Sequence, residues 1–237
     1  LVSYLNREQY GEAPLMKRRW NTTEPEQVAA HQKYSSDWDY FWNYQLKHMY
    51  LRYFGWNYVG VDGDSKDAGV DWRQLYGIPL LLGFFGAFYH WSKDWKMAFV
   101  ASVFFLIMGF VLVVYFNMQE PQPRERDYFY VGSFFIFSMW VGIGILGLID
   151  EIKERFFREQ NATPAAYAVL AVALAAVPLN MARVNFNEAD RTGNYVAWDY
   201  SYNLLQSCEK DAILFTNGDN DTFPLWYFQF ALNERPD

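Results

Sequence analysis

Cysteine and histidine are scarce in this sequence of 237 residues, which contains Cys208 as its single cysteine and three histidines. A lone thiol cannot form a disulfide within the chain. His31, His48 and His90 lie far apart and share no spacing with the cysteine that zinc sites use. A metal site in this chain would therefore have to be built from carboxylates.

Clusters of basic residues are also missing. The chain has 20 Lys and Arg against 27 Asp and Glu, which gives a formal net charge of -7. Nucleic-acid binding depends on clustered Lys and Arg that neutralise phosphates. The charge pattern therefore argues against a nucleic-acid partner.

Apolar residues are abundant and occur in blocks. Hydrophobic residues make up 52% of the chain and aromatic residues 21%, yet the mean hydropathy is only -0.17. Such values are typical of apolar blocks that alternate with polar segments. Four blocks stand out: Leu75–Trp91, Met97–Phe116, Tyr128–Ile149 and Thr163–Met181.

These blocks predict about four transmembrane helices, because a helix needs about 20 apolar residues to cross the hydrocarbon. The second and third blocks satisfy this length without a charge, and the first and fourth are near the lower limit. Buried helices of a large soluble protein are the alternative. Tyr and Trp at the block ends favour the membrane, and glycines in the third block predict close helix packing.

The basic residues of the connecting loops predict the orientation. Five lie in the loops on one side: Lys93, Lys96, Lys153, Arg155 and Arg158. Two arginines, Arg124 and Arg126, lie in the loop on the other side. Because basic loops stay cytoplasmic, we expect residues 1–74 and 183–237 on the outer side of the membrane, with the transmembrane region at 75–182.

The two outer segments differ in their patterns. Trp38–Gly60 is aromatic at helical spacing and predicts a helix lying at the membrane surface or on the outer wall of the protein, with Phe41, Tyr44, Met49 and Tyr53 on one side. In the tail, a helical pattern, a short apolar run and a second helical pattern follow one another. The fold class expected is thus a mainly α membrane protein followed by the start of an α/β domain.

The tail also contains two aspartates in "GDNDT", where Gly218 is expected to turn the chain after the strand Ala212–Phe215. In a structural interpretation, Asp221 or Thr222 caps the second helix. In a functional one, Asp219 and Asp221 face an acceptor or a cation, because a D-x-D spacing holds a divalent metal in many sugar-nucleotide enzymes. The pattern alone supports no confident metal site.

Arg124 and Arg126 immediately precede the third apolar block. Ordinary interfacial anchoring with mutual ion pairs would explain them. The functional alternative is that they bind a lipid phosphate, because guanidinium holds phosphate through paired N–H groups. The aspartates of Asp62–Gly69 match no calcium loop, and we expect a solvated loop there.

Several stretches together resemble the multi-pass bacterial family named domain of unknown function 2723, which is similar to protein O-mannosyltransferases. The stretches are "YLNREQYGEAPL", "HMYLRYFGWNYVG", "QPRERDYFYVGSF", "DRTGNYVAWDYSYNLL" and "AILFTNGDNDTFPLWY". The resemblance implies a class C glycosyltransferase core in a bacterial inner membrane, with its outer loops in the periplasm. It also implies a polyprenyl-phosphate sugar donor and a protein acceptor.

The expected reaction moves a sugar, plausibly mannose, from the lipid phosphate to a Ser or Thr hydroxyl. In that class the catalytic carboxylate lies in the first outer loop. We expect this chain, which starts at Leu1, to be an internal piece without that residue. A non-catalytic membrane scaffold or envelope-polymer-binding protein is the rival interpretation. A transporter is disfavoured because the blocks contain no charged residues.

Overall fold

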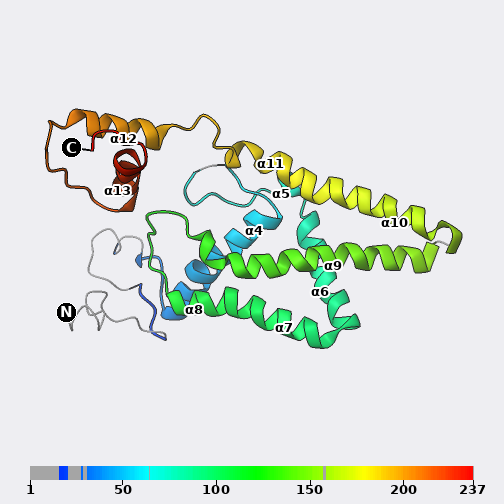
Figure 1. Ribbon diagram of the computed structural model, residues 1–237. Helices are drawn as coiled ribbons and strands as arrows, with labels where there is room; N and C mark the ends of the chain where they lie inside the picture. The colour runs from blue at the N-terminus through cyan, green and yellow to red at the C-terminus, as the bar shows by residue number, and fades with distance from the viewer. Residues whose placement is uncertain (1–15, 21–27, 29–30, 64, 157–158, 237) are drawn as a thin grey trace. The chain divides into compact units, whose positions relative to one another are not determined.

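The computed structural model describes residues 16–20, 28, 31–63, 65–156 and 159–236, and divides into two compact units (Figure 1). The first unit is Leu1–Val184 and the second is Asn185–Asp237.

The first unit is helical. Its first long helix has three consecutive parts, α3 (Asp37–Tyr40), the π-helical η2 (Phe41–Leu51) and α4 (Arg52–Tyr58). The later elements are α5 (Trp72–Leu75), α6 (Ile78–Lys93), α7 (Trp95–Leu106), η3 (Ile107–Val111), α8 (Leu112–Phe116), η4 (Asp127–Tyr130), α9 (Val131–Phe156), α10 (Glu159–Leu174), η5 (Ala175–Leu179) and α11 (Asn180–Ala189).

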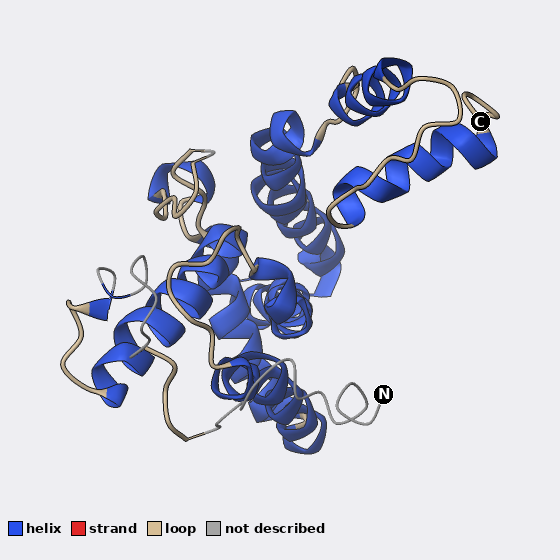
Figure 2. Ribbon diagram, turned by 90° about the vertical axis from the view of Figure 1, so that its left-hand side faces the viewer, coloured by secondary structure: helices blue, strands red, loops and turns tan. Residues whose placement is uncertain are grey.

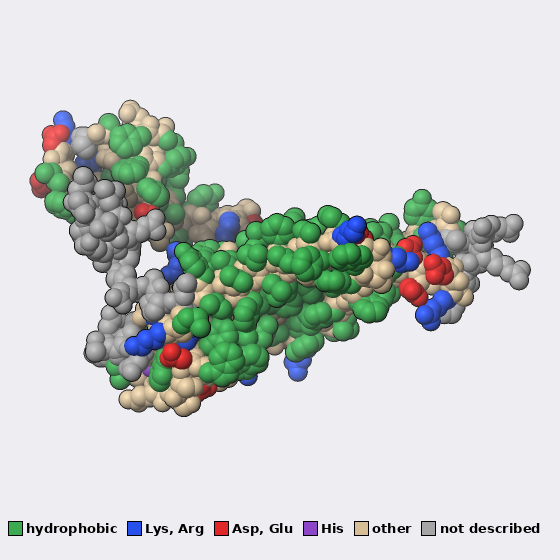
Figure 3. Space-filling model, turned by 90° about the horizontal axis from the view of Figure 1, so that it is seen from below, with side chains coloured by type: hydrophobic (Ala, Val, Ile, Leu, Met, Phe, Trp, Pro, Cys, Tyr) green, Lys and Arg blue, Asp and Glu red, His purple; other side chains and the backbone are tan. Residues whose placement is uncertain are grey.

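Within the described residues, three helices are long and apolar enough to cross a membrane: Trp95–Phe116, Asp127–Arg155 and Thr163–Asn187. In Figure 3 hydrophobic side chains cover the visible face of this bundle, and charged side chains gather near the helix ends. Large side chains such as Phe99 and Leu106 are more than half exposed. An apolar surface of this kind fits an integral membrane protein. The helix of the first block, α6, has 16 residues and falls short of the other three.

Glycines allow α6 to pack closely against α9, as the sequence predicts. A methyl group added to Gly86 would overlap the carbonyl oxygen of Trp140, and one added to Gly144 would overlap the carbonyl oxygen of Leu82. The backbones of the two helices therefore touch directly, which is how helices associate where no hydrophobic effect drives them together. Figure 1 shows α7 and α10 alongside α9, which both helices contact.

The aromatic helix of residues 37–58 buries the side that the sequence predicts to be aromatic in the core of this unit, while Trp38 and Trp42 on another side are exposed. Tyr44, Met49 and Tyr53 are at most 3% exposed, and Tyr50 packs against α9 residues. Gln45 lies four residues after Phe41 and four before Met49, and it is buried on the same side as both.

The second unit contains two main helices, α12 (Val196–Ser207) and α13 (Asp219–Trp226), with η6 (Tyr227–Ala231) continuing the second. Both tail helices are thus confirmed. The strand predicted at Ala212–Phe215 is not formed: this segment is extended but unpaired, and Phe215 is 90% exposed. A strand needs a neighbour for its backbone hydrogen bonds. The described residues contain no strand (Figure 2), so an α/β tail is not observed.

Arg235 closes the end of α12. Its guanidinium donates hydrogen bonds to the carbonyl oxygens of Leu205 at 3.0 Å, Cys208 at 3.1 Å and Glu209 at 3.1 Å. The last carbonyls of a helix have no partner within the helix, and a cation there also suits the helix dipole. Arg235 therefore holds the end of this unit against its first helix.

Gly86→Ala should destabilise the first unit by about 1–3 kcal/mol, because the methyl group meets backbone atoms that cannot move aside. Gly142→Ala is the matched control, since nothing lies within 4 Å of a methyl group there. Alanine favours a helix more than glycine does, so the control should be neutral or stabilising. Thermal unfolding of the purified protein in detergent measures both, and equal effects would contradict direct backbone contact.

Arg235→Gln should loosen α12 by about 1–3 kcal/mol, because three carbonyl oxygens lose a charged donor. Faster amide hydrogen exchange over the last turn of α12 would report this change. Arg191→Gln, at an exposed position of the same unit, controls for the loss of positive charge. Unchanged exchange in Arg235→Gln would show that the cap does not hold this helix end.

Candidate functional site

The cavities of the first unit differ sharply in their chemistry. An apolar groove of about 460 Å³ between α6, α9 and α10 is lined by aliphatic side chains such as Leu82 and Leu148. A second pocket, of about 250 Å³, is lined by polar and titratable side chains, which include Tyr44, His48 and Glu120. This polar pocket contains the groups needed for recognition or proton transfer, and it is the candidate site.

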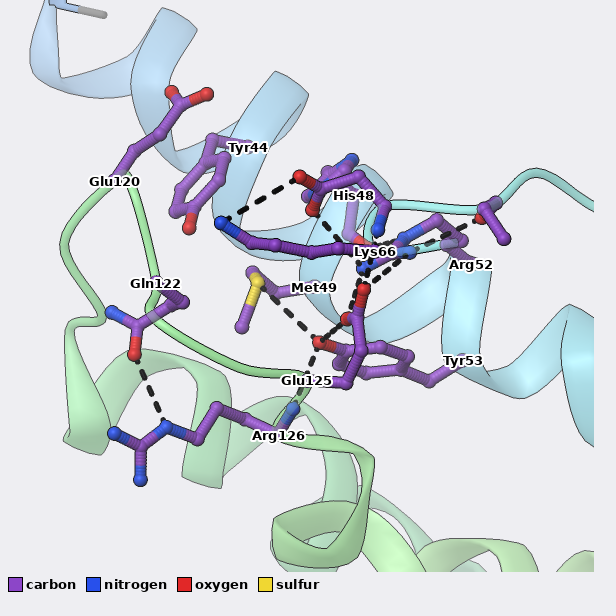
Figure 4. Close-up of polar contacts among 12 residues, drawn as sticks. Tyr44, His48, Met49, Arg52, Tyr53, Lys66, Glu120, Gln122, Glu125 and Arg126 are labelled. Atoms are coloured by element: carbon purple, nitrogen blue, oxygen red, sulfur yellow. Dashed lines mark hydrogen bonds and ion pairs between the residues drawn. The ribbon is translucent and has the colours of Figure 1, made fainter. Parts of the chain in front are cut away.

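The Asn117–Arg126 loop forms one wall of the polar pocket, and Glu125 fixes this loop to the aromatic helix. The Glu125 carboxylate accepts hydrogen bonds from Arg52 Nη2 at 2.8 Å, the Tyr53 hydroxyl at 2.6 Å and the Asp67 backbone N–H at 2.6 Å (Figure 4). Burial alone would raise the pKa of Glu125, but these donors and the Arg52 charge lower it to about 2. Glu125 is therefore ionised at neutral pH.

Arg52 is compensated on every side. Its side chain is 8% exposed and lies over the rings of Tyr53 and Trp56, 4.7 and 4.5 Å from their centroids. It also donates to the carbonyl oxygens of His48 at 2.9 Å and Ala68 at 3.1 Å. A guanidinium with its charge and its N–H groups used in this way stabilises the fold and has little capacity left for a ligand.

Glu120 lies on the same loop as Glu125 and lines the polar pocket. Its two carboxylate oxygens accept hydrogen bonds from Lys33 Nζ at 2.7 Å and the Tyr34 hydroxyl at 2.6 Å. Burial raises the pKa of Tyr34, and the neighbouring Glu120 raises it further. Tyr34 therefore stays protonated and donates to the carboxylate.

His48 lines the polar pocket between Tyr44 and Asp67. Its ring stacks on Tyr44, with centroids 5.4 Å apart, and its Nε2 lies 3.0 Å from Asp67 Oδ1. Burial and the nearby Arg52 lower the pKa of His48, although its hydrogen bond to Asp67 opposes them. His48 is neutral at physiological pH, because its pKa already begins close to 6.5.

Arg124 and Arg126 lie next to this pocket, around Tyr128. Arg126 donates to the Tyr128 hydroxyl at 2.9 Å and, through Nε, to Gln122 Oε1 at 3.2 Å. The Arg124 guanidinium lies 6.0 Å from the centroid of the Tyr128 ring. Among the described residues, no carboxylate lies within 4.0 Å of either guanidinium, so the mutual ion pairing expected as one alternative is absent there. Glu125, between them in sequence, pairs with Arg52 instead.

The tail aspartates are arranged differently from the prediction. The helix cap is Gly218, with a φ of 101°, so neither Asp221 nor Thr222 caps α13. Thr222 Oγ1 instead donates to the Gly218 carbonyl at 2.8 Å. Asp219 and Asp221 both lie in the first turn, where residues two apart point in different directions. No cluster of three metal-ligating residues occurs among the described residues.

Sequence reasoning missed Arg52, Glu120 and Glu125, although "QEPQPRERD" displayed two of them. The mixed charges of that loop were the available signal, but the functional hypothesis included only its arginines. The Asp62–Gly69 loop is not merely solvated, since Asp67 binds Glu125 through its backbone and His48 through its side chain. The "YLNREQYGEAPL" stretch lies outside the described residues.

Comparison with known proteins gives one family match. The model of TMEM260-associated domain 2 matches residues 197–237, which span α12 and α13. This match corrects the resemblance to the domain of unknown function 2723 family, because it points to a different family. No curated protein and no solved structure matches the chain.

Glu125→Gln should lower the unfolding free energy by about 2–4 kcal/mol at pH 7, because it leaves the buried Arg52 with only the more distant Asp67 carboxylate, 3.9 Å away, as a counter-charge. The wild-type carboxylate has a depressed pKa, so its contribution is complete above the unfolded-state value and is lost as pH falls toward 2. Stability of the wild type should thus decline between about pH 5 and pH 3 more steeply than that of Glu125→Gln.

Denaturant unfolding at several pH values measures this difference. Glu151→Gln is the control, because the half-exposed Glu151 pairs with the exposed Arg155 at 3.1 Å on the surface of α9. Such surface pairs contribute less than about 1 kcal/mol. Parallel pH curves for the wild type and Glu125→Gln would contradict the role given to Glu125.

Proposed function

We propose that this chain is part of a membrane glycosyltransferase that moves a sugar from a polyprenyl-phosphate donor to Ser or Thr hydroxyls of a protein. The observation that carries the proposal is the pair Arg124 and Arg126. Both precede a membrane-length helix, and neither has a carboxylate partner among the described residues. A lipid phosphate at the membrane boundary would complete their charge.

The chemistry of the donor supports these roles. When a sugar leaves a lipid phosphate, negative charge grows on the phosphate oxygens, and fixed cations stabilise that charge in the transition state. Guanidinium suits the task because it stays protonated and presents parallel N–H groups. Arg126 is held by Gln122 and Tyr128, so it is oriented before a ligand arrives.

The proposal includes the membrane topology. The fourth crossing is assigned to α6, and the Lys and Arg bias of the loops favours an outer position for residues 1–74 and 183–237. The membrane proposed is a bacterial inner membrane, with the Arg124–Arg126 loop on the periplasmic side. Asp219 and Asp221, at the start of α13, remain candidates for contact with the protein acceptor or a cation.

Arg124→Gln combined with Arg126→Gln in the full-length protein should lower sugar transfer about 100-fold, because two charge-assisted contacts to phosphate are lost. Protein abundance and thermal stability should stay near wild type, since neither guanidinium forms an ion pair among the described residues. Transfer is measured with a polyprenyl-phosphate sugar and a Ser/Thr peptide.

Arg155→Gln, which removes an exposed arginine near the end of α9, is the matched control. A loss of abundance without a loss of transfer per molecule would reduce both arginines to structural anchors. Arginine-dependent binding of the lipid by a full-length protein that transfers no sugar would favour the rival function, a non-catalytic membrane scaffold.

A further inference from the structure

Gln122 joins two features of the first unit. Its side chain lines the polar pocket, and its Oε1 accepts the hydrogen bond from Arg126 Nε at 3.2 Å. Figure 4 shows Gln122 between Glu120 on one side and Arg126 on the other. The polar pocket and Arg126 are therefore adjacent, with Gln122 shared between them.

We propose that the polar pocket binds a neutral sugar ring, namely the ring carried by the lipid phosphate. The identity of the lipid phosphate rests on the proposed function, whereas the sugar preference rests on the pocket itself. At about 250 Å³ the pocket is smaller than the 300–1,000 Å³ typical of drug-sized ligands. Its volume suits a single ring.

The lining offers what a polyhydroxylated ring needs. Each carboxylate can accept about four hydrogen bonds, and Glu120 uses two of these positions for Lys33 and Tyr34. Its remaining lone pairs are available to ligand hydroxyls. Asn43 adds an exposed amide from the aromatic helix, and Tyr44 adds a phenol and an apolar ring face.

The charges of the pocket select against an anion. Glu120 and Asp67 supply two carboxylates, and Lys33 is the one permanent cation among the lining residues. His48 adds no positive charge while its ring is neutral. A phosphate would be repelled from the pocket and attracted to Arg124 and Arg126, so the charge pattern separates the two halves of a sugar phosphate. A small cation is the competing occupant.

The test compares two lipids on the full-length protein in nanodiscs: a polyprenyl phosphate that carries mannose and the same lipid phosphate without a sugar. In the wild type the sugar-bearing lipid should bind about tenfold more tightly, which corresponds to one good charged hydrogen bond. Asn43→Ala and Glu120→Gln should bring this ratio toward one without changing the affinity for the sugar-free lipid.

Arg124→Gln combined with Arg126→Gln should weaken both lipids equally and leave the ratio unchanged. The two variant classes thus separate the sugar pocket from the phosphate site. Binding of methyl mannoside, followed by saturation-transfer NMR, tests the pocket without any phosphate. If neither lipid binds but the glycoside does, the proposed function fails and the sugar pocket stands.

Asn43→Ala keeps the test decisive if Glu120→Gln disturbs folding, because Asn43 is exposed and its side-chain amide donates to the nearby Asp39 at 2.6 Å. Glu151→Gln, on the surface of α9, controls for a lost carboxylate. The proposal is overturned if Asn43→Ala keeps both the lipid ratio and the glycoside signal of the wild type. It is equally overturned if calcium or ammonium ions, and not the glycoside, occupy the pocket.

Discussion

The ion pair between Arg52 and Glu125 is the contact on which the candidate site depends. It joins the aromatic helix to the loop that connects two membrane-length segments, across a distance of 2.8 Å. The Tyr53 hydroxyl and the Asp67 backbone N–H donate further hydrogen bonds to the same Glu125 carboxylate. Three stretches that are far apart in sequence meet at one carboxylate. The loop has no regular secondary structure of its own, so its position is defined by such side-chain contacts.

A largely buried ion pair does not by itself indicate high stability, because the desolvation penalty of the two charges offsets much of their Coulombic attraction. The Arg52–Glu125 pair instead defines the position of the loop relative to the aromatic helix. Glu120, Gln122 and Arg126 lie on the same loop as Glu125, within six residues of it. Fixing the Glu125 carboxylate therefore also positions Glu120, Gln122 and Arg126.

Much of the helical architecture could be predicted from the apolar runs of the sequence. The residues of the candidate site could not be predicted in this way. Apolar runs identify membrane-length helices because hydrocarbon demands both length and the absence of charge. The glycines of the third block predicted close packing, which Gly144 confirms. The packing partners of the aromatic helix, such as Tyr130 and Phe134 against Tyr50, were not predicted because they come from a distant part of the chain. The tail strand was predicted wrongly because strand pairing depends on a neighbour, and a short apolar run does not specify one.

The partners of the loop charges were equally hidden from the sequence. "RER" displays two arginines around one glutamate, and local pairing is the simplest expectation. In the structure Glu125 turns to Arg52, 73 residues earlier, and leaves Arg124 and Arg126 near Tyr128 and Gln122. One long-range contact thus has two effects: it neutralises the buried cation Arg52 and leaves Arg124 and Arg126 without a carboxylate partner among the described residues. The structural role of Glu125 is therefore what makes these two arginines available for the phosphate that we propose.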